Sequence, residues 1–209
     1  MPEYTLQARV PHLYTKIRDK ETSPVDFRRY AQRLMSIICE EALCYVSGQE
    51  KTVDTPVDSY TFPGCEVDQS NIVAISIIRA ADSMLDVFMN IVPECGVGKI
   101  LIQRNEETAE PEMYYDKVPP LTGKKVVLLD PMLATGGSAK AALEVLVKKG
   151  AEQKDITFVN VVTCPEGVKN VMEAYPDITM FSGCVDEGLT TKKYIYPGLG
   201  DFGDRYFFT

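Results

Sequence analysis

Short runs of apolar residues recur along the chain, separated by stretches in which apolar residues fall three or four positions apart. Runs this short are typical of strands buried in a sheet, whereas the wider spacing predicts helices with one buried face. The predicted strands lie at 72–78, 99–103, 125–129, 156–162 and 178–184.

Helical patterns follow most of these strands. The clearest helix start is Ser23-Pro24-Val25-Asp26, which combines an N-cap serine, a proline at the first helical position and a carboxylate three residues after the cap. The apolar face of this helix continues toward Gly48, a residue type that often ends helices. Further helices are predicted at 83–91, 139–147 and 165–175. The alternation of strand and helix predicts an α/β fold with a mainly parallel, open sheet and helices on both faces.

Two segments depart from this alternation. Residues 52–64 are rich in turn-forming and β-forming residues, and residues 104–120 are polar and interrupted by prolines. The second segment is too long for a plain turn, and long loops in compact domains are often functional, so we expect a lid or arm there. The remaining elements predict a single domain, 1–209, with an N-terminal helical segment at 1–50.

Composition narrows the class of protein. The 209 residues are 45% hydrophobic and 25% charged, as in ordinary globular proteins. No apolar run reaches the roughly 20 residues that span a bilayer, and the first residues do not form a leader pattern. We therefore expect a cytoplasmic protein that binds no membrane.

Charge and cysteine content exclude other classes. A net charge of −8 argues against a surface that coats nucleic acid. The six cysteines form no CxxC pair and His12 is the only histidine, so a zinc site of these residues is not expected. An anionic ligand must therefore be held by local features of the chain.

One such feature follows the predicted strand 125–129. Asp130 comes directly after the strand, where ligands bind in open α/β sheets, and a carboxylate there can accept hydrogen bonds from two ribose hydroxyls. Thr135-Gly136-Gly137-Ser138 precedes a predicted helix, so hydroxyls and backbone amides can converge on a phosphate. The alternative is that Ser138 caps the helix and the glycines only turn the chain.

The segment 129–138, Leu-Asp-Pro-Met-Leu-Ala-Thr-Gly-Gly-Ser, resembles the phosphoribosyl pyrophosphate motif of uracil phosphoribosyltransferases, in which a proline replaces a second acidic residue. The segments 18–23, 104–111, 165–168 and 194–205 are similar to stretches of the same family in the same order. The resemblance covers nearly the whole chain. It implies a type I phosphoribosyltransferase fold with a protruding loop or β-arm and a C-terminal hood, 185–209, over the base.

The resemblance also assigns residues to substrates. It implies that Arg79 and Arg104 bind the pyrophosphate group, and each follows a predicted strand, where a guanidinium fork can hold phosphate oxygens. The phosphoribosyl pyrophosphate site would further contain Asp130, Pro131, Met132, Leu133, Ala134, Thr135, Gly136, Gly137, Ser138 and Asp201. The catalytic residues would be Arg79, Arg104, Asp130 and Asp201.

The hood would recognise uracil mainly through backbone groups. The resemblance assigns this role to Ile195, Gly200 and Phe202, with Asp201 facing the phosphoribosyl group. Another interpretation is that Pro197-Gly198 and Gly200 are ordinary turns, and that Tyr194, Tyr196 and Phe202 are core residues.

The implied reaction is pyrimidine salvage, in which uracil and phosphoribosyl pyrophosphate give UMP and diphosphate. Mg²⁺ would arrive with the diphosphate of the substrate and have no direct protein ligand. Members of the family commonly form dimers, and some form larger assemblies that respond to GTP. We therefore expect at least a homodimer, with a tetramer and GTP as a candidate assembly and effector.

Two positions differ from the family pattern. The chain has Ala81 in Arg79-Ala80-Ala81-Asp82, where glycine usually follows Arg-Ala, and Phe208 near the end, where glycine is usual. Glycine matters where φ is positive or the backbone lies close to a ligand. These differences motivate an alternative, a weak or inactive paralogue that acts as a nucleotide-binding regulatory protein. A third interpretation is a phosphoribosyltransferase for orotate or a purine.

Overall fold

A central sheet organises the chain in the computed structural model, which describes residues 6–46, 48–104 and 111–209. The strands lie in the order β5-β4-β3-β6-β8, with β7 and β9 also pairing with β8. All pairs are parallel except β4 with β5. The strands are β3 (Ile72–Ile78), β4 (Gly96–Arg104), β5 (Pro111–Lys117), β6 (Lys125–Leu129), β7 (Met132–Leu133), β8 (Ile156–Thr163) and β9 (Thr179–Val185).

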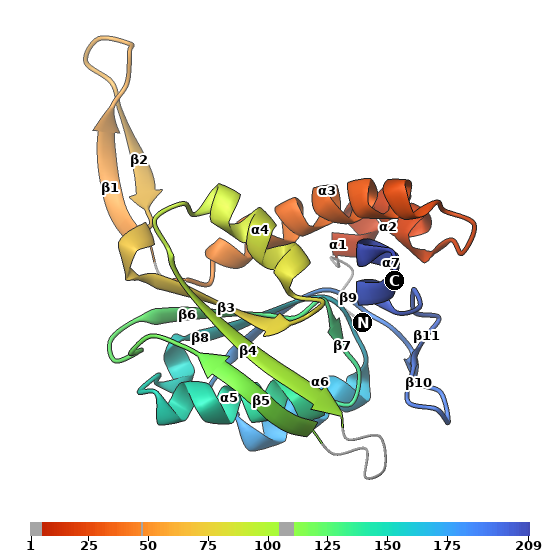
Figure 1. The fold of residues 1–209 in the computed structure, drawn as a ribbon. Coiled ribbons are helices and arrows are strands. Elements are labelled where there is room, and N and C mark those ends of the chain that lie inside the picture. Colours follow the sequence, from red (N-terminus) through yellow and green to blue (C-terminus); the bar gives the residue numbers. More distant parts are fainter. Residues whose placement is uncertain (1–5, 47, 105–110) are drawn as a thin grey trace.

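Helices cover both faces of this sheet (Figure 1). On one face lie α3 (Pro24–Leu43) and α4 (Asp82–Ile91), with α1 (Leu6–Arg9) and α2 (Pro11–Arg18) beside α3. On the other lie α5 (Gly137–Lys148) and α6 (Pro165–Ala174). Short 3-10 turns at Gln69–Asn71 and Gln153–Asp155 precede β3 and β8. The predicted α/β class, with a mainly parallel sheet and helices on both faces, is confirmed.

The start of α3 forms as the sequence predicts, but its end does not. Ser23 Oγ accepts a hydrogen bond from the Asp26 amide at 3.2 Å, as expected of an N-cap. The α-helix ends at Leu43, before Gly48. The chain then tightens into turns in which the amides of Tyr45 and Val46 bond carbonyls three residues back. A glycine is therefore not needed to stop this helix.

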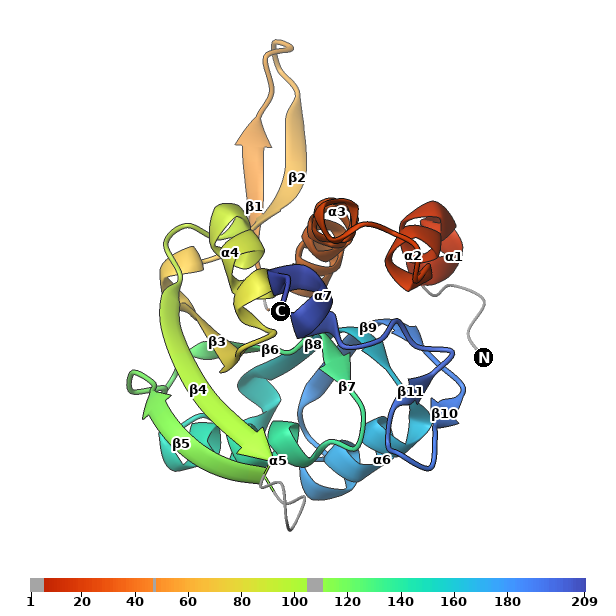
Figure 2. The ribbon, with the colours of Figure 1, turned by 45° about the vertical axis from the view of Figure 1, so that its right-hand side comes forward.

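A β-hairpin projects from the body of the molecule (Figures 1 and 2). It pairs β1 (Gln49–Asp54) antiparallel with β2 (Thr61–Glu66), and most of its side chains are exposed. The sequence indicated β structure at 52–64 but not an arm. It placed the arm or lid at 104–120 instead, where 111–117 form β5 and extend the sheet. Residues 105–110 lie outside the described residues, so the lid stays a prediction.

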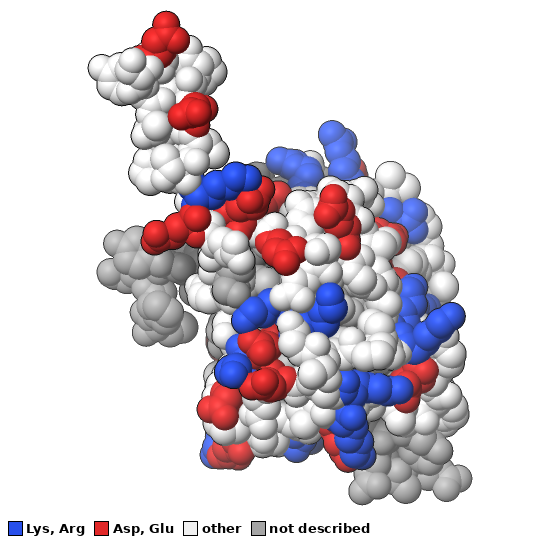
Figure 3. Space-filling model, turned by 90° about the vertical axis from the view of Figure 1, so that its left-hand side faces the viewer, with Lys and Arg blue, Asp and Glu red and all other residues white. Residues whose placement is uncertain are grey.

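Charged side chains of both signs are interspersed over the face that carries the hairpin (Figure 3). At the base of the hairpin Lys51 Nζ pairs with Glu66 Oε1 at 2.6 Å.

Within the described ranges, no helix is both long enough and apolar enough to cross a membrane.

Candidate functional site

The candidate site lies where the sheet divides. β3 pairs with β6 as far as Ser76 and Leu129, and beyond that pair the two strands separate. β3 remains paired with β4, while the chain after β6 stays with β8 and becomes β7. Because β4 and β6 lie on opposite sides of β3, the gap between β3 and β6 is a topological switch point, the usual ligand site of open α/β sheets.

Asp130 and Pro131 form the break between β6 and β7 without changing the register. Leu129 pairs with Val159 and Met132 with Val162, so both strands advance by the same number of residues. Pro131 has no N–H to donate. Its carbonyl accepts the amides of residues 161 and 162 at 3.1 and 3.0 Å, and Asn160 Nδ2 donates to the Asp130 carbonyl at 3.0 Å. The backbone at the break is therefore held entirely by β8.

This backbone carries the Asp130 carboxylate to the carboxyl end of the sheet. Its Oδ1 accepts a weak hydrogen bond from the Met132 amide at 3.4 Å. Burial raises the pKa of Asp130 to about 7, although the hydrogen bond from Met132 acts in the opposite direction. The carboxyl group therefore exchanges its proton near neutral pH, and hydrogen bonds from ligand hydroxyls would favour its charged form.

The loop after β7 forms a concavity at the start of α5. Gly136 has a φ of 83°, which favours glycine, and a Cβ there would lie 3.0 Å from Val171 Cγ2 of α6. The concavity measures about 60 Å³ and is lined by Asp130 and residues 132–139. The first amides of a helix have no partner within it, so this pocket suits a small anion such as a phosphate. The predicted residues from Asp130 to Ser138 are thus brought together.

Arg79 follows β3, across the gap from Asp130. Its Nη2 pairs with Asp204 Oδ1 of α7 (Phe202–Phe207) at 2.5 Å, and its Nη1 donates to Thr209 Oγ1 at 2.8 Å. The guanidinium lowers the pKa of Asp204. Arg104 ends the neighbouring strand β4, and its side chain lies outside the part of the chain that the structure describes.

The loop after Arg79 does not need a glycine at position 81, where this chain has alanine. Ala81 is buried and has a φ of −70°, a conformation open to any residue. The charge of Asp82 is also compensated. Its carboxylate accepts a hydrogen bond from Ser76 Oγ at 2.7 Å and pairs with Lys99 Nζ at 2.9 Å.

The C-terminal segment carries β10 (Gly188–Leu189), β11 (Ile195–Tyr196) and α7 over this edge of the sheet (Figure 2). A buried ion pair fixes its central turn. Arg18 Nη2 contacts Asp186 Oδ1 at 2.6 Å, and both residues also bond Gly198: Arg18 donates to its carbonyl at 2.8 Å and Asp186 accepts its amide at 2.9 Å. The turn is thus tied to the end of α2.

Arg205 of α7 ties the same segment to the N-terminal helices. Its guanidinium donates to the carbonyls of Ile17 and Leu199 at 2.5 Å and to that of Asp19 at 2.7 Å. It also lies 4.2 Å over the ring of Phe27 in α3. The segment is therefore positioned by residues far away in the sequence.

The residues predicted to bind a base lie along this segment. Gly200 has a φ of 83°, and the Asp201 carboxylate accepts the Asp204 amide at 2.8 Å as the N-cap of α7. Ile195 and Phe202 are buried, and the Phe202 ring packs against Phe27 at 5.3 Å. The side chains of these two residues belong to the core, so only their backbone groups could read a ligand.

The three aromatic residues of this segment differ in their surroundings. The interpretation of them all as core residues holds for Phe202 but is wrong for Tyr194 and Tyr196, which are 61% and 41% exposed.

Phe208, which replaces a usual glycine, lies in the left-handed region with a φ of 65°. A side chain in this conformation costs roughly 1–2 kcal/mol. Arg28 lies 4.1 Å over the Phe208 ring and also donates to the Tyr206 carbonyl at 2.8 Å. Phe208 is exposed and is the C-cap of α7.

Sequence reasoning missed the residues that position the site. Arg18 and Arg205 lie inside the stretches that resemble the family, but neither stands out by pattern. Asn160 could have been found, because it is a polar residue inside the apolar run 156–162 and is fully buried. A buried amide in such a strand must bond something nearby.

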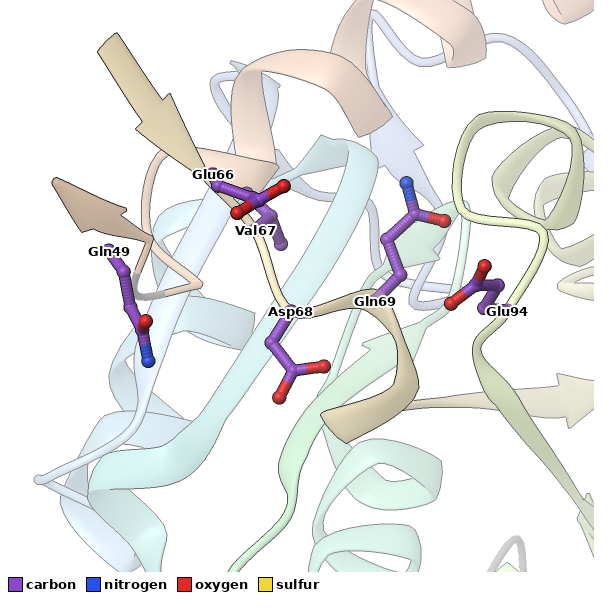
Figure 4. A pocket seen from close by; sticks show the side chains of 6 residues that line it. All are labelled: Gln49, Glu66, Val67, Asp68, Gln69 and Glu94. Carbon is purple, nitrogen blue, oxygen red and sulfur yellow. The ribbon is translucent and has the colours of Figure 1, made fainter. Parts of the chain in front are cut away.

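A larger concavity of about 440 Å³ lies at the base of the hairpin (Figure 4). It is lined by Gln49, Glu66, Val67, Asp68, Gln69 and Glu94. These residues precede β3 and β4, so they lie at the opposite edge of the sheet from Asp130. Carboxylates make this pocket unsuited to a polyanion. Among the described residues, no group of three or more His, Cys, Asp or Glu could hold a metal ion.

Comparison with known proteins gives one consistent family. The profile of the family described as uracil phosphoribosyltransferase matches residues 5–209. A uracil phosphoribosyltransferase of Dictyostelium discoideum is 43% identical, covering 94% of this chain and 91% of its own. One from Saccharomyces cerevisiae is 42% identical, covering 93% and 90%. The solved structure of the AQ2163 protein from Aquifex aeolicus is 37% identical with a TM-score of 0.82, covering 95% and 94%.

The pKa of Asp130 predicts how stability depends on pH. The folded protein holds this proton more tightly than the unfolded chain, so ionisation at Asp130 destabilises the fold as pH rises from about 4 to about 7. Asp130→Asn removes this contribution. We expect the free energy of unfolding of the variant, relative to the unsubstituted protein, to increase across this range and to level off above pH 7. Denaturant titrations of both proteins at several pH values measure this difference in unfolding free energy. A difference that does not change with pH would contradict the prediction.

Proposed function

The chain belongs to the uracil phosphoribosyltransferase family, and we propose that the gap between β3 and β6 is the place where it carries out the family's reaction. The enzyme joins uracil to phosphoribosyl pyrophosphate and releases UMP and diphosphate. The observation that supports this location is the meeting of Asp130 with the loop 132–139 around one concavity at the switch point.

The ribose 5-phosphate end of the substrate would lie in that concavity. The amides of the loop and of the start of α5 would bind the phosphate, and the Asp130 carboxylate would accept hydrogen bonds from the ribose hydroxyls. Pro131, Met132 and Leu133 would contribute through their backbone, since they hold the loop on β8. The near-neutral pKa of Asp130 means that binding these hydroxyls would draw the group into its charged form.

The diphosphate would lie on the other side of the gap, with Arg79 and Arg104 as its charged partners. Arg79 would exchange Asp204 for phosphate oxygens, an exchange of one exposed ion pair for another. Mg²⁺ would be carried by the diphosphate and would have no direct protein ligand. Asp130 and Asp201 are the acidic side chains assigned to the phosphoribosyl pyrophosphate site. The bound ion would neutralise charge on the leaving group.

Uracil would bind under the hood, 185–209, against backbone groups near Ile195, Gly200 and Phe202. The bond from the ribosyl C1 to diphosphate would break while uracil N1 attacks the opposite face. The proton leaving N1 would pass toward Asp201, whose carboxylate is fixed at the start of α7. Charge stabilisation and close positioning of the reactants, rather than a histidine base, would lower the barrier.

Assembly and regulation are inferred from the surface and the resemblance. The exposed apolar side chains Val53, Val57, Tyr60 and Phe62 of the hairpin make it a suitable contact for a homodimer, or for a tetramer that responds to GTP. The lid expected within 104–120 stays a prediction, since 111–117 form β5 of the sheet. All the cysteines described are free thiols, as is usual in the cytoplasm, where we place the protein.

The activity itself is tested with a panel of bases. Purified protein with Mg²⁺ and phosphoribosyl pyrophosphate should release diphosphate with uracil, and about 10⁴-fold more slowly with cytosine, which leaves polar groups of the hood unpaired. Asp130→Asn should lower turnover and leave the circular dichroism spectrum unchanged. Equal rates with orotate or a purine, or no diphosphate release with any base, would refute the proposal.

A second variant tests whether Ala81 impairs the enzyme. Ala81 already has a right-handed conformation, so Ala81→Gly relieves no backbone strain. The substitution does add conformational freedom to the unfolded chain. We expect the free energy of unfolding to fall by about 0.5–1 kcal/mol and kcat to stay within about twofold. Denaturation and steady-state kinetics measure both. A large rise in kcat would instead identify Ala81 as the cause of a weakened enzyme.

A further inference from the structure

The loop 132–139, called the phosphate loop below after its proposed function, has three consecutive carbonyls that point toward the same neighbouring segment. Thr163 Oγ1 donates to the Leu133 carbonyl at 3.1 Å, and Cys164 Sγ to the Ala134 carbonyl at 3.2 Å. Asn170 Nδ2 donates to the Thr135 carbonyl at 2.6 Å. Thr163 ends β8, Cys164 is the N-cap of α6 and Asn170 lies within α6, and none of the three lines the concavity.

The orientation of these carbonyls fixes the orientation of the amides. In a trans peptide the C=O of one residue and the N–H of the next point in opposite directions. The amides of Ala134, Thr135 and Gly136 therefore point away from the three donors, and all three residues line the concavity. A row of amides with this orientation is a typical anion-binding arrangement.

Close packing makes this arrangement rigid. Gly167 of α6 lies against the loop, and a Cβ there would approach the Leu133 carbonyl to 2.9 Å. Asn170 is oriented by a second contact, since its Oδ1 accepts Lys140 Nζ of α5 at 2.8 Å. Thr163 and Cys164 are fully buried, and burial raises the pKa of the Cys164 thiol, which keeps the S–H that it donates.

We propose that Thr163, Cys164 and Asn170 are positioning residues, which hold the amides of the phosphate loop toward the 5′-phosphate by engaging the three carbonyls behind them. This rests on the proposed function of the same loop. The three residues touch no part of the substrate. Their effect would be specific to the ligand that carries the phosphate.

The test compares variants that remove a donor with variants that keep it. Thr163→Val keeps the size of the side chain but loses the hydroxyl, whereas Thr163→Ser keeps the hydroxyl. Asn170→Ala removes the amide, and Lys169→Ala is the control from the adjacent exposed position of α6. For each protein, KM for phosphoribosyl pyrophosphate, KM for uracil, kcat and the melting temperature are measured.

We expect Thr163→Val and Asn170→Ala to raise KM for phosphoribosyl pyrophosphate roughly 3- to 10-fold, the effect of one lost hydrogen bond. KM for uracil should stay within about twofold, and Thr163→Ser and Lys169→Ala should match the unsubstituted protein. A merely structural role would lower the melting temperature without separating the two KM values, and this result would overturn the inference. Absence of turnover in the unsubstituted protein would instead refute the proposed function, and this inference with it.

Discussion

The whole site depends on one constraint in the sheet: the chain after β6 must leave β3 and yet remain on β8. Pro131 permits this, because it cannot donate a hydrogen bond and its carbonyl is satisfied by two amides of β8. Asn160 satisfies the remaining carbonyl, that of Asp130. An unsatisfied buried carbonyl would cost about 1–3 kcal/mol. With the carbonyls of Asp130 and Pro131 both paired on β8, the chain leaves β3 without losing these bonds, and Asp130 and the loop 132–139 lie at the edge of the gap.

On the opposite side of the candidate site, the C-terminal segment is held in place by charged side chains. Arg18 and Asp186 are largely buried, with side chains 17% and 4% exposed, so their pairing must offset a substantial desolvation cost. The pair positions the turn between β11 and α7, because both residues form hydrogen bonds with Gly198. Arg205 acts similarly through three carbonyls. The N-terminal helices are thereby part of the site, although they contribute no predicted ligand contact.

The sequence predicted β3, β4, β6, β8 and β9, the start of α3 and the grouping of Asp130 with the loop 132–139, because these depend on local patterns, but it predicted neither β5 nor β7. It indicated β structure at 52–64 but not a projecting hairpin, whose exposed side chains give no burial pattern. The partner of Arg79 was also missed, since Asp204 lies 125 positions away in the chain. The cis peptide bond at Ile78–Arg79, which involves no proline, has no sequence signal of its own. Contacts between distant segments thus account for most of what the sequence could not predict.

The most direct test of the central claim is a crystal structure of the protein with UMP. We predict that the 5′-phosphate lies in the concavity after β7, with oxygens about 2.7–3.2 Å from amides of residues 134–138. The ribose hydroxyls should lie within the same range of the Asp130 carboxylate. A 5′-phosphate bound elsewhere, with the loop empty and Asp130 facing no hydroxyl, would contradict the assignment of this loop as the ribose-phosphate site.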